Sequence, residues 1–439
     1  MKTKEFSLAA ETPMITELLG KSKEELREFC VTLGEPAFRG AQIYHALYSE
    51  RKFDVGQITN LPAALRERLL REARVTLPEV KQRFTSADGS VRYLFGLGDA
   101  EKVKTFNAEG TESTEFAEKS GEERASRRLQ KPASVEAVFM PSEGRQTICV
   151  STQAGCAVDC HFCLTAQLGL IRNLTAGEIL AQVLLPLEEA HRGTRIEMKD
   201  GGLPAGLGQV PPAATKQIEE KDGGLKPAAT RTGLAPQSNI VLMGQGEPLL
   251  NFEPVMAAVR IMLDPEGLGI SPKHMTLSTS GIVPGIERLA QEKVRPKLAI
   301  SLNASHDEQR DALMPINKKY PLSVLMKACK EYPLRTWEHL TFEYVMLGGL
   351  NDAAEDARRV VRLLAPLKSA KVNLIPWNPG ELPYHESSPE RIEEFRRILV
   401  DRGVPAFVRY SRGRDVMAAC GQLALLQIDC APLSVVSPQ

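Results

Sequence analysis

The run Cys156-Ala-Val-Asp-Cys160-His-Phe-Cys163 places three thiols within eight residues, and it constrains this chain more than any other stretch. Its intervals of four and three residues allow one tight loop to aim all three sulfurs at a common point. Thiolates presented in this way bind a soft metal, which is either zinc or an iron–sulfur cluster. The rest of the chain is therefore expected to hold a metal-binding loop in place.

The number of available ligands helps to separate the two metals. A structural zinc ion takes four protein ligands, and the remaining ligands usually arrive in a second paired motif. No Cys or His pair stands near the loop, and His161 is directed elsewhere because it is adjacent to Cys160. Three cysteines on a four-iron cluster would leave one iron open to a substrate atom. The loop thus favours a catalytic cluster, with a zinc site as the alternative.

Composition narrows the class of protein. The chain has 439 residues, 43% of them hydrophobic, which is enough for about two to three domains. Lys plus Arg and Asp plus Glu both number 55, so no overall basic field indicates a nucleic-acid partner. Eight cysteines, no secretory segment after Met1 and no apolar run of membrane-spanning length indicate the reducing cytosol. We expect a cytoplasmic protein that does not contact membranes.

The first part of the chain, residues 13–75, reads as helices separated by turns. From Lys21 to Arg83 there are 12 Lys or Arg residues against 9 Asp or Glu residues, with aromatic residues between them. Two interpretations stay open: a solvated helical face around a small core, or an RNA-docking module.

Residues 76–141 read as short strands interrupted by a polar, flexible insertion at 107–133. Glu136 alternates with Val135 and Ala137, a pattern typical of a solvent-facing carboxylate.

Residues 142–410 alternate between strands and helices. The first strand, Gln146–Ser151, leads into the cysteine loop, and the capping box Thr175–Glu178 starts a helix that runs to about His191. Residues 192–237 read as a second flexible insertion. Further strands are expected near 239–243, 275–279, 297–302, 340–346, 371–376 and 406–410. Strands joined by helices form a parallel sheet, so the fold class is α/β, with the sheet curled into a partial (β/α) barrel.

Polar or glycine-bearing segments follow these strands, at the edge where parallel sheets place their ligands. Gly244 and Gly246 would let backbone carbonyls approach an ammonium group, and Glu247 adds a charged acceptor. Four further side chains at this edge suit a ribose and an adenine edge: Ser278, Ser301, Asn303 and Asn378.

The cysteine loop resembles that of the radical S-adenosylmethionine (SAM) superfamily. Together with Cys420, which lies in the final segment 411–439, and with GEPLLN, LSTSG, LMPINKKYPL and PWNP, it closely resembles the RlmN family over most of residues 20–425. That family methylates carbon-2 of an adenine in 23S rRNA and of an anticodon-loop adenine in certain tRNAs. Pro248 and Trp377 favour this reaction over that of the sister family Cfr, which methylates carbon-8.

The resemblance implies a [4Fe–4S] cluster on the three loop cysteines and two SAM molecules per turnover. Cys420 would take a methyl group from the first molecule. Cleavage of the second would yield a 5′-deoxyadenosyl radical, which activates that methyl group for addition to the base. Cys149 would then release the product by forming a disulfide with Cys420, and Glu136 matches a proposed proton acceptor. Whether Glu136 or Cys149 takes the carbon-2 proton stays open. The implied SAM-binding residues are Gly246, Glu247, Ser278, Ser301, Leu302, Asn303 and Asn378.

Two positions depart from the family pattern: Asn303 replaces a frequent His, and Gln245 replaces a common Met. Three other thiols, Cys30, Cys329 and Cys430, are expected to be structural. The implied partners are 23S rRNA, tRNA and an electron donor such as flavodoxin or ferredoxin, and the chain is expected to be a monomer.

Two competing classes remain. A zinc-stapled RNA-binding protein without catalytic activity would have no need of Cys149 or Cys420. A radical enzyme acting on a small molecule would need the loop cysteines alone, so the additional thiol pair argues against it.

Overall fold

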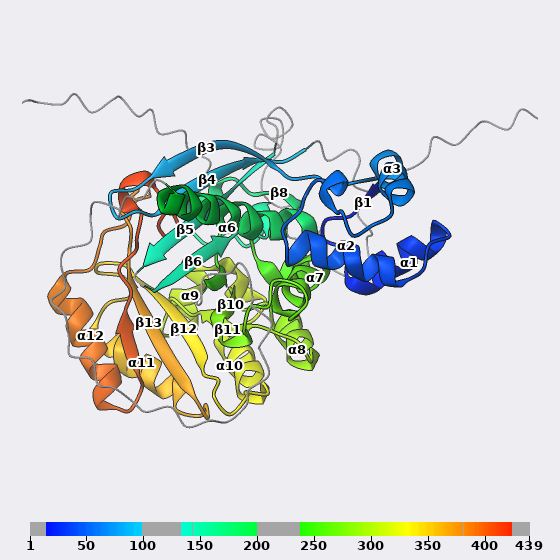
Figure 1. Ribbon diagram of the computed structural model, residues 1–439. Helices are drawn as coiled ribbons and strands as arrows, with labels where there is room; N and C mark the ends of the chain where they lie inside the picture. Colours follow the sequence, from blue (N-terminus) through cyan, green and yellow to red (C-terminus); the bar gives the residue numbers. More distant parts are fainter. Residues whose placement is uncertain (1–14, 99–132, 143, 200–237, 381, 424–439) are drawn as a thin grey trace, which may run out of the picture.

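The computed structural model describes residues 15–98, 133–142, 144–199, 238–380 and 382–423, with only the backbone described for 192–199. Its centre is a ten-stranded sheet in the order β14-β13-β12-β11-β10-β9-β6-β5-β4-β3 (Figure 1). The strands from β14 to β6 run parallel, and β5, β4 and β3 continue the sheet in antiparallel fashion. The predicted α/β class with a partial barrel is confirmed.

The parallel strands lie at or within two residues of the predicted positions. They are β6 (Arg145–Val150), β9 (Ser238–Leu242), β10 (Met275–Thr279), β11 (Lys297–Ser301), β12 (Leu340–Met346), β13 (Ala370–Pro376) and β14 (Ala406–Val408). The antiparallel strands are β3 (Glu79–Thr85), β4 (Val91–Gly96) and β5 (Ser134–Ser142).

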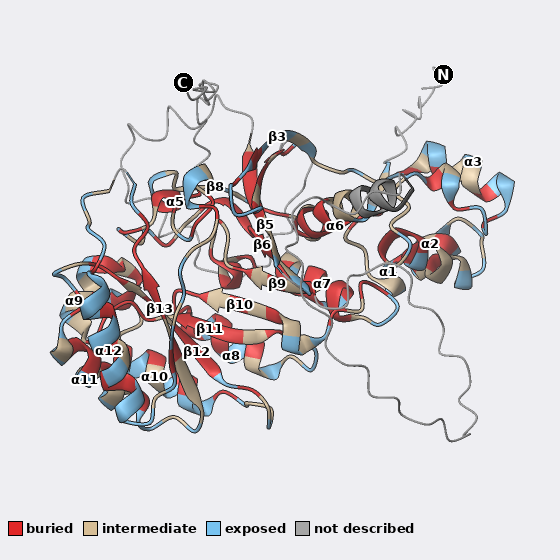
Figure 2. Cartoon of the chain, turned by 60° about the vertical axis from the view of Figure 1, so that its left-hand side comes forward, coloured by how far each residue is buried: buried red, intermediate tan, exposed pale blue. Residues whose placement is uncertain are grey.

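Helices cover the outer face of the parallel strands (Figure 1). They are α6 (Ala176–Lys199), α7 (Phe252–Leu263), α8 (Val283–Gln291), α9 (Asp307–Leu313), α10 (Leu322–Glu331), α11 (Ala354–Leu364) and α12 (Pro389–Asp401). Figure 2 shows buried residues along the strands and on the helix faces that meet the sheet. The hydrophobic core therefore lies between the sheet and its outer helices.

The inner face of the parallel strands is polar. In β10, Met275 and Leu277 are buried against the helices, whereas Thr276 and Ser278 face a cavity inside the curved sheet. Strand side chains alternate between faces, so one strand can serve the core and the cavity together. The interior of this partial barrel is a binding space and not a packed core.

The first helices form a separate group beside α7. They are α1 (Lys23–Thr32), α2 (Phe38–Tyr48) and α3 (Ala63–Glu72), with the short strands β1 (Thr16–Glu17) and β2 (Ala73–Arg74) paired in parallel. Tyr44 donates a 2.8 Å hydrogen bond to Asp264, and Lys23 pairs with Glu266 at 2.6 Å. These contacts join α1 and α2 to the segment that follows α7.

Helix α6 begins as predicted and ends later. Thr175 and Glu178 form the expected reciprocal bonds, at 2.9 Å and 3.2 Å. The helix continues to Lys199, so the first eight residues of the predicted insertion 192–237 are helical. No proline occurs between 192 and 199, and the first Gly-Gly pair stands at 201–202, which explains the later end. The rest of that insertion and residues 107–132 of the other lie outside the described residues.

No helix in the described part of the chain is long and apolar enough to cross a membrane.

Candidate active site

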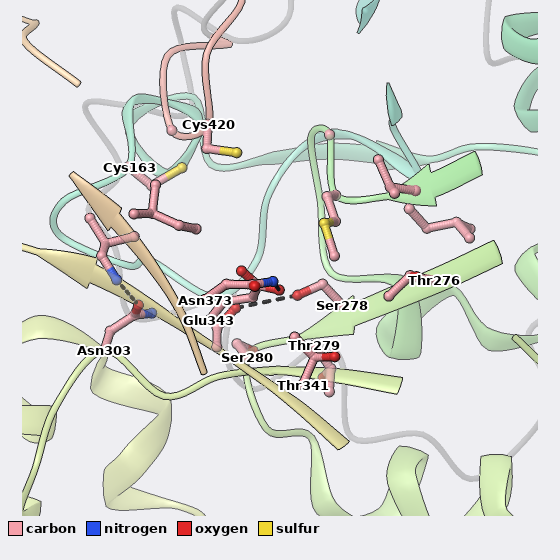
Figure 3. A pocket seen from close by; sticks show the side chains of 18 of the residues that line it. Cys163, Thr276, Ser278, Thr279, Ser280, Asn303, Thr341, Glu343, Asn373 and Cys420 are labelled. Atoms are coloured by element: carbon pink, nitrogen blue, oxygen red, sulfur yellow. Dashed lines mark hydrogen bonds between the residues drawn. The ribbon is translucent and has the colours of Figure 1, made fainter. Parts of the chain in front are cut away.

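A cavity of about 570 Å³ occupies the inner face of the parallel strands and opens beneath the cysteine loop. Figure 3 shows Cys163 and Cys420 at one end of this cavity, with polar strand residues below them. Most of the predicted site residues line it: Cys156, Cys160, Cys163, Gly246, Glu247, Ser278, Ser301, Asn303, Asn378 and Cys420. The other predicted residues, Glu136, Cys149 and Leu302, are buried outside its lining.

The cysteine loop connects β7 (Gln153–Gly155) to the short helix α5 (Leu164–Gln167). Gly155 has a positive φ of 74°, and a Cβ on it would lie 1.8 Å from the carbonyl oxygen of Gly169, so only glycine fits there. The Cys156 N–H donates to the same oxygen at 3.1 Å. The start of the loop is therefore held tightly against the segment that follows α5.

The three loop thiols share the cavity. Burial raises the pKa of Cys156 to about 12 and raises the pKa values of Cys160 and Cys163. Within the described residues, no three His, Cys, Asp or Glu side chains converge closely enough to hold a single metal ion. Three cysteines of one loop that line the same cavity are a ligand set for an iron–sulfur cluster, so the residues present fit such a group.

The segment after β9 contains the glycines that were expected to approach a ligand. A Cβ on Gly244 would lie 2.6 Å from Ser151 Oγ, and one on Gly246, whose φ is +96°, would lie 2.5 Å from Gln153 Cβ. Close packing against residues 151–153 therefore requires glycine at both positions, whatever the ligand. The segment runs directly beside β6 and β7.

Glu247 presents a buried carboxylate to the cavity. It accepts hydrogen bonds from the Ser280 N–H at 2.7 Å, the Ser280 hydroxyl at 2.8 Å and the Leu249 N–H at 3.1 Å. Burial raises the pKa of Glu247, and the bonds from Ser280 oppose that effect. This arrangement gives the site one anionic acceptor suited to an ammonium group.

Ser278 and Ser301 lie on neighbouring strands, with their hydroxyl oxygens 3.5 Å apart. Asn303 follows them in the left-handed conformation, with φ at 55°. Asn and His both adopt this region more readily than most residues, which accounts for Asn where His was expected. Its Oδ1 accepts from the Val345 N–H at 2.8 Å, as Figure 3 shows. Leu302, which lies between Ser301 and Asn303, has a fully buried side chain, so only its backbone can make polar contacts with a ligand.

Asn378 connects the last part of the barrel to the segment that carries Cys420. Its amide nitrogen donates to the Ser411 hydroxyl at 2.9 Å and to the Cys420 carbonyl at 3.1 Å. On the other side, the Leu164 N–H donates to the Gly421 carbonyl at 2.8 Å. These contacts place Cys420 directly above the cysteine loop.

Cys149 and Cys420 lie near each other beside the cavity. Cys149 is buried in a small apolar group with Val138, Ala418 and Leu423. Burial raises the pKa of Cys149, and the nearby Cys420 thiol raises it further. Cys420 as a residue is exposed, yet its thiol faces the cavity and burial raises its pKa to about 11. Two thiols that are far apart in the sequence are thus near each other in space.

Glu136 is fully buried. The interpretation of this residue as a solvent-facing carboxylate, based on strand alternation, is therefore wrong. Glu136 forms an ion pair with Arg92, whose exposed fraction is 1%, and accepts from Gln245 Nε2 at 3.3 Å. Gln245 Nε2 also donates to the Leu423 carbonyl at 3.4 Å. The segment that carries Cys420 covers this face of β5, a contact that strand alternation alone does not reveal.

Several cavity residues lie within the strands and not in the segments that follow them, where the sequence pattern predicted the site. Lys297, Thr341, Glu343, Lys371 and Asn373 line the cavity from within the strands. Asn373 donates to Glu343 at 2.9 Å. The signal was present in the sequence, since these polar residues recur at every second position of strands that otherwise read as apolar.

Arg310 was also missed. It is fully buried on α9, and its guanidinium donates to the carbonyls of Ser280 at 2.6 Å, Ser301 at 3.1 Å and Leu302 at 3.2 Å. Burial lowers its pKa to about 10. Arg310 therefore fixes the ends of two strands that carry site residues.

Two family models match the chain. The model described as the ribosomal RNA large subunit methyltransferase N-terminal domain matches residues 16–75. The model of the radical SAM superfamily matches residues 229–364.

Curated relatives resemble nearly the whole chain. A probable dual-specificity RNA methyltransferase RlmN of Koribacter versatilis is 44% identical over 89% of this chain and 96% of its own length. The dual-specificity RNA methyltransferase RlmN of Anaeromyxobacter dehalogenans is 40% identical over 93% of this chain and 91% of its own. Among solved structures, a radical SAM methyltransferase from Sphaerobacter thermophilus matches with a TM-score of 0.73 and 36% identity, over 93% of this chain and 99% of that one.

Proposed function

The chain belongs to the RlmN family of radical SAM RNA methyltransferases, and from that premise we propose that it methylates carbon-2 of adenine in 23S rRNA and in the anticodon loop of tRNA. This assignment requires a methyl carrier, a residue that releases the product, a cluster site and access for RNA. Each has a counterpart among the residues described above.

The observation that carries the proposal is the position of Cys149 beside Cys420 next to the cavity that the three loop cysteines line. An enzyme that only cleaves SAM needs the loop cysteines alone. A covalent methyl carrier needs one additional thiol, and release of the product from that carrier needs a second. The two positions support Cys420 as the carrier and Cys149 as the thiol that releases the product.

Cys156, Cys160 and Cys163 would hold the cluster, proposed as [4Fe–4S], and SAM would lie against it in the cavity. When bound, the cluster would supply the electron, obtained from a donor such as flavodoxin or ferredoxin, that cleaves SAM. Glu247 would accept from the SAM ammonium group. Ser278, Ser301, Asn303 and the backbone at Gly246 and Leu302 would contact its remaining polar groups, with Asn378 at the rim.

After carbon–carbon bond formation, the base is attached to the Cys420 sulfur through a methylene group. The Cys149 thiolate would attack that sulfur and form a disulfide with it. The bond between sulfur and carbon breaks with its electron pair on carbon, and a proton completes the new methyl group. Before this step, the adduct loses the carbon-2 proton and one electron, which restores the aromatic ring. The buried Glu136 carboxylate, held by Arg92 and Gln245, is the proposed acceptor of that proton, and the cluster, when bound, would accept the electron.

An RNA substrate is supported by the cations at the cavity floor. Lys297, Lys371 and Arg409 all line the cavity, with the Glu343 carboxylate near Lys371 and Arg409. Burial lowers the pKa of Lys297, and the nearby Lys371 lowers it further. Glu343 offsets these three cations only in part, and a cluster with excess positive charge suits a phosphate backbone that leads a flipped base to the site.

The N-terminal helices offer a second surface for RNA. Phe38 on α2 is 55% exposed, and the guanidinium of Arg39 lies 4.7 Å from its ring centre. An exposed aromatic ring beside an arginine suits stacking on an unpaired base together with a phosphate contact. We propose that residues 13–75 dock RNA through this surface, as a unit distinct from the core at 142–410.

The deciding experiment combines two measurements on anaerobically purified protein. Mass spectrometry of Cys420 tests for a methyl group, and nucleoside analysis of RNA incubated with SAM and a reductant tests for 2-methyladenosine. Both signals are expected. Formation of 8-methyladenosine would overturn the assigned carbon. Unmodified Cys420 with bound zinc and no modified nucleoside would overturn the proposed function as a whole.

A further inference from the structure

The tip of the β3–β4 hairpin lies against the segment that carries Cys420, although the two are more than 300 residues apart in the chain. The hairpin tip, residues 86–90, connects β3 to β4, and the segment 411–423 follows β14; Figure 1 shows the red end of the chain beside these blue strands. The contact between these distant parts includes hydrogen bonds and an ion pair between Arg412 and Asp88. Its members can therefore be tested one at a time.

Two carboxylates form this contact reciprocally. Asp88, on the hairpin, accepts from the Gly413 N–H at 3.0 Å and from Arg412 Nε at 3.4 Å. Asp415, on the segment, accepts from the Ser86 hydroxyl at 2.6 Å and from the Ala87 N–H at 3.0 Å. Arg412 also donates to the Asp88 carbonyl at 2.6 Å and to the carbonyl of Pro141.

The hairpin tip is built to direct Asp88 outward. Its Oδ1 accepts from the Ser90 N–H at 2.8 Å, which closes the turn, and its Oδ2 is the atom that contacts the segment. Gly89 has a φ of +79°, which the turn needs and which glycine adopts without strain. One carboxylate therefore orders its own turn and binds the segment with its second oxygen.

The segment transmits this anchor toward Cys420. The Ala418 N–H donates to the Gly413 carbonyl at 2.8 Å, which closes a compact turn two residues before Cys420. A Cβ on Gly413 would lie 2.7 Å from the Ala418 Cβ, so the turn is closely packed. Beyond Cys420, the Thr165 hydroxyl donates to the Leu423 carbonyl at 2.5 Å. The Cys420 thiol thus lies between an anchor on the hairpin and an anchor on α5.

We propose that Asp88 is a positioning residue that holds the segment 411–423 so that the Cys420 thiol stays over the cavity. The hairpin has a second role in the same site, because β4 also carries Arg92, which pairs with Glu136. One hairpin would then set the position of both the methyl carrier and the proton acceptor. This inference rests on the proposed function for its catalytic consequence, but not for the anchoring itself.

The first measurement needs no RNA. Hydrogen exchange of the full-length protein is followed in peptides that cover residues 411–423, for wild type, D88A, D88N and D401N. Asp401 is an exposed residue at the end of α12 and serves as the matched control. D88A should speed exchange of the Gly413 and Ala418 amides about tenfold or more, because the anchor opens locally. Exchange in D88N should be intermediate between wild type and D88A, since the Asn amide oxygen still accepts one hydrogen bond. Exchange in D401N should match wild type.

The second measurement is the amount of 5′-deoxyadenosine formed per methylated adenine. If Cys420 is displaced, SAM is still cleaved but fewer cleavage events lead to a methylated adenine, so this ratio should rise several-fold in D88A. The melting temperature and the rate of reductive SAM cleavage should stay near wild type. Wild-type exchange and a wild-type ratio in D88A would overturn the proposal. Should D88A fail to fold, D415A removes the reciprocal anchor and must give the same two changes. Absence of methylated adenine from wild type would instead indicate failure of the proposed function.

Discussion

Arg92 and Glu136 form an ion pair in which the two side chains are only 1% and 0% exposed. The pair joins neighbouring strands β4 and β5 on the face that the Cys420 segment covers. Two nitrogens of Arg92, Nε and Nη2, find no hydrogen-bond partner among the described residues, while Phe84 packs against the guanidinium at 4.0 Å. Burying the Arg92 guanidinium is costly because part of it has no hydrogen-bond partner, and the Glu136 carboxylate beside it offsets that cost.

Replacing Arg92 by Ala should lower the free energy of unfolding by about 3–5 kcal/mol, because it leaves an uncompensated carboxylate in the interior. Urea denaturation measures this change. R260A, which removes an exposed partner of Glu292 at 2.8 Å, should have a much smaller effect. R92M combined with E136M should recover much of the loss, since neither charge then remains. A small effect of R92A with no recovery in the double variant would contradict this account.

Cys149→Ala should leave methylation of Cys420 intact and block release of the product. Protein joined covalently to RNA should then accumulate, visible as a nuclease-sensitive shift on a denaturing gel. C420A should show neither the joined species nor methylated RNA. C329A is the matched control, because Cys329 is a buried thiol on α10 outside the cavity lining. Normal turnover by C149A would remove this thiol from the reaction.

Lys297→Ala and Lys371→Ala should each weaken RNA binding and reduce the slope of log affinity against log salt by about 0.7 per lost phosphate contact. Fluorescence anisotropy with a stem-loop RNA at several salt concentrations measures both. K327A, an exposed lysine on α10, should leave the slope unchanged. SAM cleavage without RNA should stay normal in every variant. An unaltered slope in K297A and K371A would exclude the cavity floor as a phosphate site.

Phe38→Ala with Arg39→Ala should reduce affinity for RNA while leaving the barrel intact. The ring is exposed and the two side chains contact each other, so their loss removes little packing. The same anisotropy assay applies, with V31A on α1 as the control for an exposed apolar residue. Unchanged RNA affinity would show that the surface at Phe38 and Arg39 does not bind RNA.

Acidification should release the Cys420 segment from the hairpin. Burial opposes ionisation of Asp88, but hydrogen bonds from Ser90 and Gly413 outweigh it and lower its pKa, and bonds from Ser86 and Ala87 lower the pKa of Asp415. A carboxyl whose pKa is lowered by docking stabilises the docked state above its undocked pKa, about 3.9, and loses that contribution as the pH falls below it. The Arg412 guanidinium faces the Asp88 carboxylate at 3.4 Å.

The measurement is the difference in hydrogen exchange between wild type and D88A over residues 411–423, corrected for intrinsic rates. It should be full at pH 7 and should shrink steadily below about pH 4. A difference that persists undiminished at pH 3 would indicate that the anchor does not depend on these carboxylates.

How far the sequence predicts this protein can be judged from particular residues. The cysteine loop, the capping box at Thr175 and the parallel strands were all found from intervals of a few residues. Polar residues after the strands were expected at one edge, and nearly all of them line one cavity. Such features depend on neighbours in the chain, through spacing, capping and alternation, so a sequence contains them directly.

The tertiary structure decided what covers each face and which distant residues meet. Glu136 reads as solvent-facing until Arg92 and the segment near Leu423 are placed on its strand. Cys149 and Cys420 become neighbours only when the chain end returns over β6, and Asp88 meets Gly413 across 325 positions. Alternation assigns side chains to two faces of a strand but does not say which face a remote segment will bury. That choice follows from packing of the whole chain, and it is what brings the Cys420 thiol, the Cys149 thiol and the Glu136 carboxylate to one side of the cavity.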